Sequence, residues 1–215
     1  MKIKESRVGY RLLKPIQQSP HFIQLVEELN KSVEMEKQKR AEFIEQLDET
    51  KKVEFINGEI IMQTPARNKH IEVSDRLFFL IYSYLIKNRF GKVKHEKTLI
   101  SLTRNDYEPD ICFWKNEKAT LFTPEQIRFP APDFIVEVIS NSTKKYDRGV
   151  KFEDYALHGV EEYWLVDPDT KSVEQYLLVG NQYQLENKKN QEGEIVSTVI
   201  QGLIISMAAI FSEEY

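Results

Sequence analysis

The stretch of sequence that decides the fold runs from Pro132 to Asp167 and reads PDFIVEVISNSTKKYDRGVKFEDYALHGVEEYWLVD. It opens and closes with short apolar runs, 134–139 and 162–167, which are typical of strands buried on both faces. Between them, residues 141–143 are good helix N-caps, and a helical pattern continues to about His158 before Gly159 ends it. The stretch therefore predicts a strand–helix–strand unit, with polar side chains gathered near the end of the first strand.

Glu137 is the only ionisable residue inside the first apolar run. A lone buried carboxylate costs several kcal/mol unless it is paired or bound to a cation. Asp147 and Lys151 stand four residues apart and share one face of the predicted helix, so Glu137 and Lys151 are expected to point into one site. The alternative is that Asp147 and Lys151 form an ordinary exposed ion pair.

Composition narrows the class of protein. The 215 residues suffice for one full domain or for a small domain with an extension. The net charge of −4 means that any nucleic-acid contact must come from a local basic patch. A single cysteine excludes an internal disulfide, and four histidines make a Cys/His zinc site improbable. No apolar run reaches membrane-spanning length and the first residues lack a signal-peptide core, so a cytoplasmic protein without a membrane partner is expected.

The chain before the central stretch divides into recognisable segments. A charged helical pattern, read as a solvated helix, a spacer or a partner-binding arm, runs from Ser19-Pro20 to Leu47. Residues 53–64 predict a hairpin turning at Asn57-Gly58, in which Glu54 is expected on a wet strand face. A helix over 68–88 begins near His70, which reads most simply as a surface residue, and one strand is expected over 92–102.

Asp110 follows a proline at the beginning of an otherwise apolar strand. Together with Glu137 it could hold a hard divalent cation, and Mg²⁺ suits a site with only one or two protein carboxylates. A nearby lysine, Lys151, could orient or deprotonate a water bound to that ion, or neutralise developing charge. The competing interpretation is a buried ion-pair network that only stabilises the fold.

These motifs carry a resemblance. The segments around Glu54, His70, Asp110, Pro132–Thr143 and Asp147–Pro168 are similar in order to the Uma-type restriction-endonuclease-like family of the PD-(D/E)xK nuclease superfamily. The resemblance covers about residues 43–211, so we expect an N-terminal helical extension over 1–42 and a nuclease-like domain over 43–215. It implies an α/β fold with a mixed sheet, flanking helices and the core order helix, three strands, helix, strand.

The resemblance also implies roles for residues. Asp110 corresponds to the Asp of the PD motif and Glu137 to the acid of (D/E)xK, while Ile139 stands where the superfamily has lysine. Lys151, on the following helix, is the position that matches the displaced lysine. Glu54, His70 and Asp147 are expected as accessory residues. Asp133 lies on the order of 13 Å along the strand from Glu137, so it is expected to cap the strand end.

The expected function is a Mg²⁺-dependent endonuclease, with Mn²⁺ as a substitute metal, that acts on nucleic acid and in the first place on DNA. Lys144, Lys145 and Arg148 are candidate phosphate contacts, although the same cluster could be a solvated surface. Enzymes of this fold often act as dimers, so a homodimer is also considered. Two alternatives stay open: a catalytically degenerate binding or regulatory protein on the same scaffold, and an interaction module that uses the charged N-terminal helix.

Overall fold

The structure is a computed structural model that describes residues 13–48 and 50–212. The described residues form two compact units, one of 13–48 with 57–59 and one of 50–56 with 60–212. Within the described ranges, no helix combines the length and the apolar character that crossing a bilayer requires.

The first unit is dominated by helix α2, Phe22–Glu45, which confirms the helix expected between Ser19 and Leu47. The hydroxyl of Ser19 accepts a hydrogen bond from the backbone N–H of His21 at 3.1 Å, just before the helix begins. Phe43 is its buried residue, and most of its other side chains are exposed. An exposed pair of Lys37 and Glu34, 2.7 Å apart, is one of the charged contacts along its surface. α2 is therefore a largely solvated helix.

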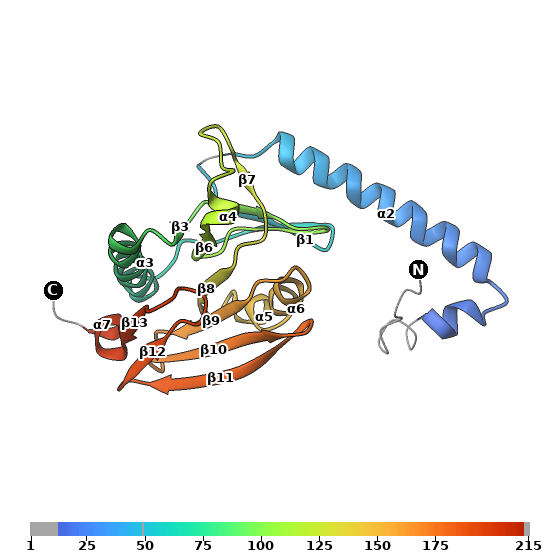
Figure 1. Cartoon of the computed structure of the whole chain (residues 1–215). Helices are drawn as coiled ribbons and strands as arrows, with labels where there is room; N and C mark the ends of the chain where they lie inside the picture. Colours follow the sequence, from blue (N-terminus) through green and yellow to red (C-terminus); the bar gives the residue numbers. More distant parts are fainter. Residues whose placement is uncertain (1–12, 49, 213–215) are drawn as a thin grey trace. The chain divides into compact units, whose positions relative to one another are not determined.

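The second unit contains three sheets and five helices that the structure describes (Figure 1). The helices are α3 Asn68–Asn88, α4 Asn116–Ala119, α5 Lys144–Asp147, α6 Val150–Leu157 and α7 Met207–Phe211. The strands are β1 Val53–Ile56, β2 Glu59–Met62, β3 Gly91–His95, β4 Leu99–Ser101, β5 Asp106–Tyr107, β6 Ile111–Lys115, β7 Arg128–Phe129, β8 Phe134–Val138, β9 Glu162–Asp167, β10 Ser172–Val179, β11 Gln182–Asn190, β12 Glu194–Val196 and β13 Ile204–Ser206.

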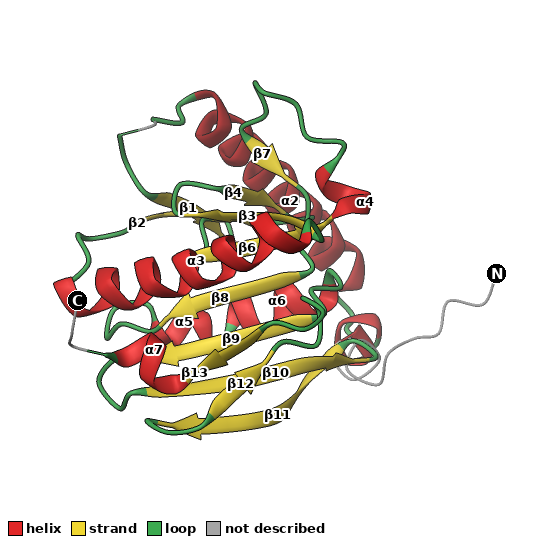
Figure 2. Ribbon diagram, turned by 60° about the vertical axis from the view of Figure 1, so that its left-hand side comes forward, coloured by secondary structure: helices red, strands yellow, loops and turns green. Residues whose placement is uncertain are grey.

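The largest sheet has six strands in the order β11-β10-β9-β8-β6-β3, and β8 and β9 are its parallel pair. The first core of buried side chains lies between this sheet and helices α3 and α7, and includes Leu77, Phe113, Val136 and Ile210. Figure 2 shows α3 crossing in front of the sheet, with α5 and α6 behind it. The sheet is thus covered by helices on both faces, as a mixed α/β fold requires.

The second core lies on the opposite face of the six-stranded sheet. It combines Ile135 and Leu165 of that sheet with Tyr155 of α6 and with residues of the five-stranded sheet, whose order is β2-β1-β5-β4-β7. Side chains at alternate positions of β6 and β8 therefore face different cores, as the two-residue period of a strand requires. The predicted order of helix, three strands, helix, strand is found as α3, β3, β6, β8, α5/α6 and β9.

The expected single helix between β8 and β9 is wrong, because the chain breaks at Gly149 into α5 and α6. Gly149 has φ −117° and ψ −107°, outside the helical region. A Cβ at this position would lie 2.7 Å from the carbonyl oxygen of Lys145. Glycine is therefore required by close backbone approach, and the break separates Asp147 from Lys151 onto two short helices.

The one strand expected over 92–102 is also divided. The segment 92–102 leaves β3 at Glu96 and Lys97, both with positive φ, and re-enters a different sheet as β4. The segment 195–205 folds back on itself as the antiparallel pair β12 and β13. The hairpin of β1 and β2 is as expected, with Asn57 and Gly58 at φ 52° and 83°. Such positive angles suit a two-residue hairpin turn.

The buried carboxylate of Glu162 on β9 connects residues 197–199 to the six-stranded sheet through hydrogen bonds. Its Oε1 accepts from the indole N–H of Trp164 at 2.7 Å and from the amide of Gln175 at 2.6 Å. Its Oε2 accepts from the Ser197 hydroxyl at 2.8 Å and from the backbone N–H groups of Thr198 and Val199 at 2.9 Å. Because the donors come from three separate segments, Glu162 is expected to stabilise the whole second unit.

Substituting Glu162→Gln should lower the free energy of unfolding by about 2–4 kcal/mol, because an amide N–H₂ would face donors at one of the two oxygen positions. Urea denaturation followed by far-UV circular dichroism measures the loss. The neighbouring Glu161→Gln, which removes the exposed pair with Lys115, is the matched control and should change stability by less than about 1 kcal/mol. Equal effects of the two substitutions would contradict this account.

Candidate active site

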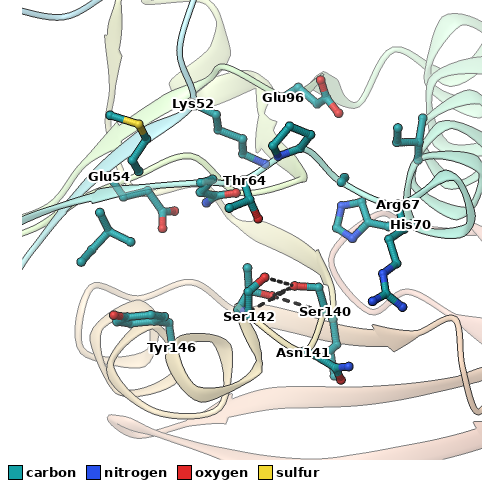
Figure 3. Close-up of a pocket in the computed structure, with 18 of the residues that line it drawn as sticks. Lys52, Glu54, Thr64, Arg67, His70, Glu96, Ser140, Asn141, Ser142 and Tyr146 are labelled. Carbon is teal, nitrogen blue, oxygen red and sulfur yellow. Dashed lines mark hydrogen bonds between the residues drawn. The ribbon is translucent and has the colours of Figure 1, made fainter.

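A pocket of about 730 Å³ opens in the second unit, next to the end of β8. Figure 3 shows its walls: Lys52 precedes β1 and Glu54 lies in it, Arg67 and His70 come from the beginning of α3, and Ser140–Ser142 with Tyr146 come from the loop and helix after β8. The hydroxyls of Ser140, Ser142 and Thr143 are joined by hydrogen bonds of 2.9 and 3.0 Å. The pocket is therefore rich in polar and basic groups.

Asp110 and Glu137 stand opposite each other beneath this pocket. The β6–β8 ladder pairs Ile111 with Val136, and one step further along the two strands brings Asp110 beside Glu137. The Oδ2 of Asp110 accepts a hydrogen bond from the backbone N–H of Val138 at 2.8 Å, which fixes this carboxylate against β8. Both residues are almost completely buried, with exposed fractions of 4% and 3%.

Lys151 of α6 lies among three carboxylates. Its Nζ is 2.8 Å from Glu54 Oε1, 3.0 Å from Glu137 Oε1 and 3.5 Å from Asp147 Oδ1. Tyr155, one turn further along α6, donates its hydroxyl to the same Oε1 of Glu137 at 3.0 Å. The expectation that Glu54 lies on a wet strand face is wrong: it is 2% exposed and its Oε1 also accepts from the backbone N–H of Glu108.

A second lysine, which the sequence analysis did not single out, contacts Asp110. The Nζ of Lys52 lies 2.9 Å from Asp110 Oδ1, and His70 Nε2 lies 3.4 Å from the same oxygen. His70 is only 13% exposed at its side chain, so the interpretation of it as a surface residue is wrong. The sequence signal for Lys52 was weak, since it is one of two adjacent lysines before the hairpin.

Burial and charge shift the pKa values of this cluster in opposite directions. Burial raises the pKa of Glu137 to about 8 although Lys151 opposes the rise, and burial likewise raises the pKa of Asp147. For Asp110, burial is outweighed by Lys52 and His70, and its pKa is lowered. Burial would lower the pKa of Lys151, but the surrounding carboxylates raise it well above its usual value, so this lysine stays a cation.

The donor set fits a divalent cation. The hydrogen-bonded cluster contains four carboxylates and two ammonium groups, so when all are ionised it carries an excess of two negative charges. Both carboxylate oxygens of Asp147 are buried without a hydrogen-bond partner. In residues 13–48 and 50–212, no group of three His, Cys, Asp or Glu side chains is arranged as a complete protein metal site. Such a set is compatible only with a divalent cation that is bound by one or two carboxylates and keeps most of its waters.

Comparison with known proteins places the chain in a family. Residues 40–208 match the model of the Uma2 family, which is described as "Putative restriction endonuclease". The chain belongs to the Uma2 family. An uncharacterized protein of Synechocystis sp., sll1609, is 30% identical over 165 residues that cover 72% of this chain and 89% of the relative. A second Synechocystis protein, slr1290, also uncharacterized, is 31% identical over 135 residues, which are 58% of this chain and 65% of that protein.

A solved structure shares the fold. It is described as a "putative nuclease" from Anabaena variabilis and superposes with a TM-score of 0.69 at 20% sequence identity. The match covers 80% of this chain and 96% of that one. The mixed α/β architecture described above is therefore that of a nuclease-like fold.

The remaining predicted residues of this Uma2 chain take different places. Asp133 lies at the far end of β8, where its carboxylate accepts from the backbone N–H of Lys115 at 2.7 Å and pairs with Lys118 at 2.8 Å. Lys144 and Lys145 are exposed on α5 but do not line the pocket. Arg148 is paired with Glu174 of β10 at 2.6 Å. The basic residues that line the pocket are instead Lys51, Lys52, Arg67, Lys69, His70, Lys97 and Lys151.

Substituting Lys151→Met should destabilise the protein by about 3–5 kcal/mol near neutral pH, because it leaves buried carboxylates without their cation. The loss should grow with pH. Burial already raises the folded-state pKa of Glu137 to about 8, above its unfolded value near 4.3, and removing Lys151 raises it further. A group of this kind contributes its full stability below the unfolded pKa and loses it as the pH rises through the folded one.

Urea unfolding of this variant at about pH 5 and pH 8, in EDTA, measures the effect. Lys145→Met makes the same chemical change at an exposed site and should leave stability nearly unchanged at both pH values. A Lys151→Met protein that is as stable as the wild type at the higher pH would contradict the account.

Proposed function

We propose that this protein is a divalent-metal-dependent nuclease that hydrolyses phosphodiester bonds of nucleic acid, with DNA as the first expected substrate. The observation that carries the proposal is the convergence of the buried Asp110 and Glu137 with Lys151, which lines an adjacent pocket together with further basic residues. Membership of the Uma2 family and the fold shared with a structure described as a "putative nuclease" support the same class of reaction.

Asp110 and Glu137 are the residues that would hold the metal, Mg²⁺ or Mn²⁺. Such an ion polarises the scissile phosphate and lowers the pKa of a bound water. Both hydrogen bonds that Glu137 receives from Lys151 and Tyr155 fall on Oε1, which orients the carboxylate and leaves Oε2 for a further ligand. The backbone N–H of Val138 orients the carboxylate of Asp110 by donating a hydrogen bond to its Oδ2.

Lys151 acts in this proposal as a hydrogen-bond donor and a fixed positive charge. Because its pKa is raised, it is a poor base, and its role is to orient the attacking water and to stabilise charge that develops on the phosphate. Glu54 and Asp147 hold its ammonium in place. Ile139, which occupies the position of the superfamily lysine, lines the same pocket, so the ammonium from α6 serves the region that a strand lysine would serve.

Lys52 controls access to Asp110. The ammonium group of Lys52 contacts Asp110 Oδ1, the carboxylate oxygen that a metal would use. The side chain of Lys52 is nevertheless 22% exposed, and it lines the pocket. A small rotation would carry the ammonium from Asp110 toward a phosphate in the pocket. We therefore assign Lys52 a second, electrophilic role, and His70 the role of holding Asp110 from the other side.

The second candidate is a nucleic-acid-binding protein whose catalytic centre is inactive. The nearly complete burial of Asp110 and Glu137 beneath two lysines favours it, because an ion can enter only if Lys52 moves. This candidate predicts retention of DNA that is independent of metal and weakens with salt.

The substitutions Asp110→Asn and Glu137→Gln should each reduce metal-dependent cleavage by at least about 100-fold, since each removes a charged oxygen ligand from the centre. Cleavage of plasmid DNA, of a single-stranded oligonucleotide and of RNA by the wild type with Mg²⁺, with Mn²⁺ and with EDTA identifies the substrate. Thermal melting of each variant verifies that it is folded.

Asp133→Asn is the control for these variants, because it alters a buried aspartate at the opposite end of the same strand. It should retain cleavage. Undiminished activity in Asp110→Asn would refute the assignment, and binding without cleavage in the wild type under every metal condition would establish the inactive-binding candidate instead.

We also propose that nucleic acid lies along the basic side of the pocket and extends over α5 to Lys144, Lys145 and Arg148. Lys97→Ala should weaken binding of a short DNA duplex in EDTA and reduce the slope of log K against log salt concentration by about one, because one phosphate contact is lost. The double substitution Lys144→Ala with Lys145→Ala should reduce the slope further. Fluorescence anisotropy across a salt series measures both.

Lys92→Ala is the matched control, since Lys92 is exposed on β3 and lies outside the pocket lining. Its slope should equal that of the wild type. A wild-type slope for the double α5 variant would exclude α5 from the binding path and confine the contact to the pocket.

A further inference from the structure

The charged groups of the proposed centre lie below the surface of the second unit. Asp110 and Glu137 are 4% and 3% exposed, and Lys151, which lines the pocket, is 1% exposed. The pocket has a volume of about 730 Å³. This value falls in the range of sites that enclose a small ligand, about 300–1,000 Å³. A phosphate group therefore has to enter the pocket to approach Lys151.

Two continuous segments of chain form much of the pocket lining. One is the end of β2 with the connection to α3, of which residues 61–67 all line the pocket, and the other is the segment 139–143 after β8. Figure 3 shows Thr64 of the first segment above Ser140 and Ser142 of the second. Rotation of side chains alone does not widen a pocket that is walled by backbone. The ligand must therefore fit between these segments.

A base-paired duplex does not offer its phosphates in a form that fits such a pocket. The phosphates lie on the outside of a stiff, stacked double helix whose grooves are about 6 and 12 Å wide. A duplex can contact the rim of the pocket, but it cannot lower one phosphate between two walls while its bases stay paired. A nucleotide that has left the stack can enter, and leaving costs least in a strand that is already single. The depth of the centre thus favours an unpaired nucleotide.

The lining offers surfaces for a base as well as for phosphates. Besides its basic residues, the pocket is lined by the apolar side chains of Ile61 and Met62 and by Tyr146. Met62 is 66% exposed, and the ring of Tyr146 also packs against the second core. A ring that the core holds in place is a rigid surface on which any base can stack. Contacts to the phosphates of a duplex need none of these apolar groups.

Two side-chain amides are available to the edge of such a base. Gln63 and Asn141 come from the two wall segments, and both line the pocket. Across 13–48 and 50–212, neither side-chain amide has a hydrogen-bond partner. An amide carries both a donor and an acceptor, which is the pattern that the edge of a base presents.

We propose that this pocket takes single-stranded nucleic acid, with one unstacked nucleotide inside it, the base against Tyr146 and the phosphate toward Lys151. Tyr146 directly precedes Asp147, whose Oδ1 is 3.5 Å from Lys151 Nζ, so the ring and the ammonium belong to neighbouring parts of the pocket. The inference rests on the proposed nuclease function and narrows its substrate. Basic residues at the rim contact phosphates of single and double strands alike, and the pocket distinguishes the two forms.

Fluorescence anisotropy in EDTA compares binding of a single-stranded DNA oligonucleotide with binding of the same sequence as a duplex. The single strand should bind at least about tenfold more tightly at equal salt, because its bases need not be unpaired. Tyr146→Ala should weaken single-strand binding by about 5- to 100-fold, the effect of losing one stacked base. It should leave duplex binding and the salt slope unchanged, because a stacking contact releases no counterions.

Three further variants complete this test. Tyr146→Phe keeps the ring and should bind single strands as the wild type does. Tyr82→Ala makes the same change as Tyr146→Ala at a tyrosine of α3 that is 47% exposed and outside the pocket lining, and it should have no effect. Met62→Ser alters an exposed side chain of the pocket and should weaken single-strand binding while sparing duplex binding. Thermal melting verifies that each variant is folded.

Cleavage with Mg²⁺ or Mn²⁺ separates this inference from the function on which it rests. A wild type that cleaves the duplex at least as fast as the single strand would keep the nuclease function and overturn the inference. Preferential single-strand binding that depends on Tyr146, without cleavage of either form, would uphold the inference for the pocket and refute the nuclease function. Equal affinities for the two forms in EDTA, or wild-type binding by a folded Tyr146→Ala, would overturn the inference.

Discussion

The structure of this protein depends on one buried ammonium group. Lys151 Nζ lies within 3.5 Å of carboxylate oxygens from Glu54 on β1, Glu137 on β8 and Asp147 on α5. β1 is distant from the other two elements in the sequence, and the three together belong to both larger sheets and to a helix. Without the ammonium, three acids would be buried without compensation, which is far less favourable than burying a paired set.

The need for a stable core does not by itself explain why four carboxylates are buried around Lys52 and Lys151. Hydrophobic side chains of similar volume would stabilise the same space at least as well as a buried ionic network. The cluster also retains more carboxylates than ammonium groups, and its second lysine, Lys52, is partly exposed and lines the pocket. Buried carboxylates beside a basic pocket are the arrangement on which the proposed site for a divalent cation and a phosphate rests.

Backbone geometry brings these groups together. The antiparallel register of β6 and β8 sets Asp110 opposite Glu137, and the break at Gly149 turns the chain so that Asp147 and Lys151 still meet although they lie on separate helices. Ile139, two residues after Glu137, and Lys151 of α6 both line the pocket. In the proposed function the ammonium group therefore comes from a helix and not from the strand.

Local patterns in the sequence determined much of this protein. The apolar runs at 134–139 and 162–167, the Asn57-Gly58 turn and the apolar period of α3 each depend on neighbouring residues, so they predicted the two central strands, the hairpin and the long helix correctly. The one helix expected between the two strands is instead two short helices. The sequence also singled out Asp110, Glu137 and Lys151, because a charged residue in an apolar setting is visible without a structure.

Only the tertiary structure decided which other side chains join them. Lys52 contacts Asp110 across 58 positions of sequence, and Glu54 reaches Lys151 from another sheet, so no local pattern distinguishes them from solvated neighbours. The same holds for Lys97, which lines the pocket because the chain leaves β3 at that point, and for Arg148, which turns to Glu174. Burial and pairing of a charged side chain depend on what the fold packs against it, and that is a property of distant residues.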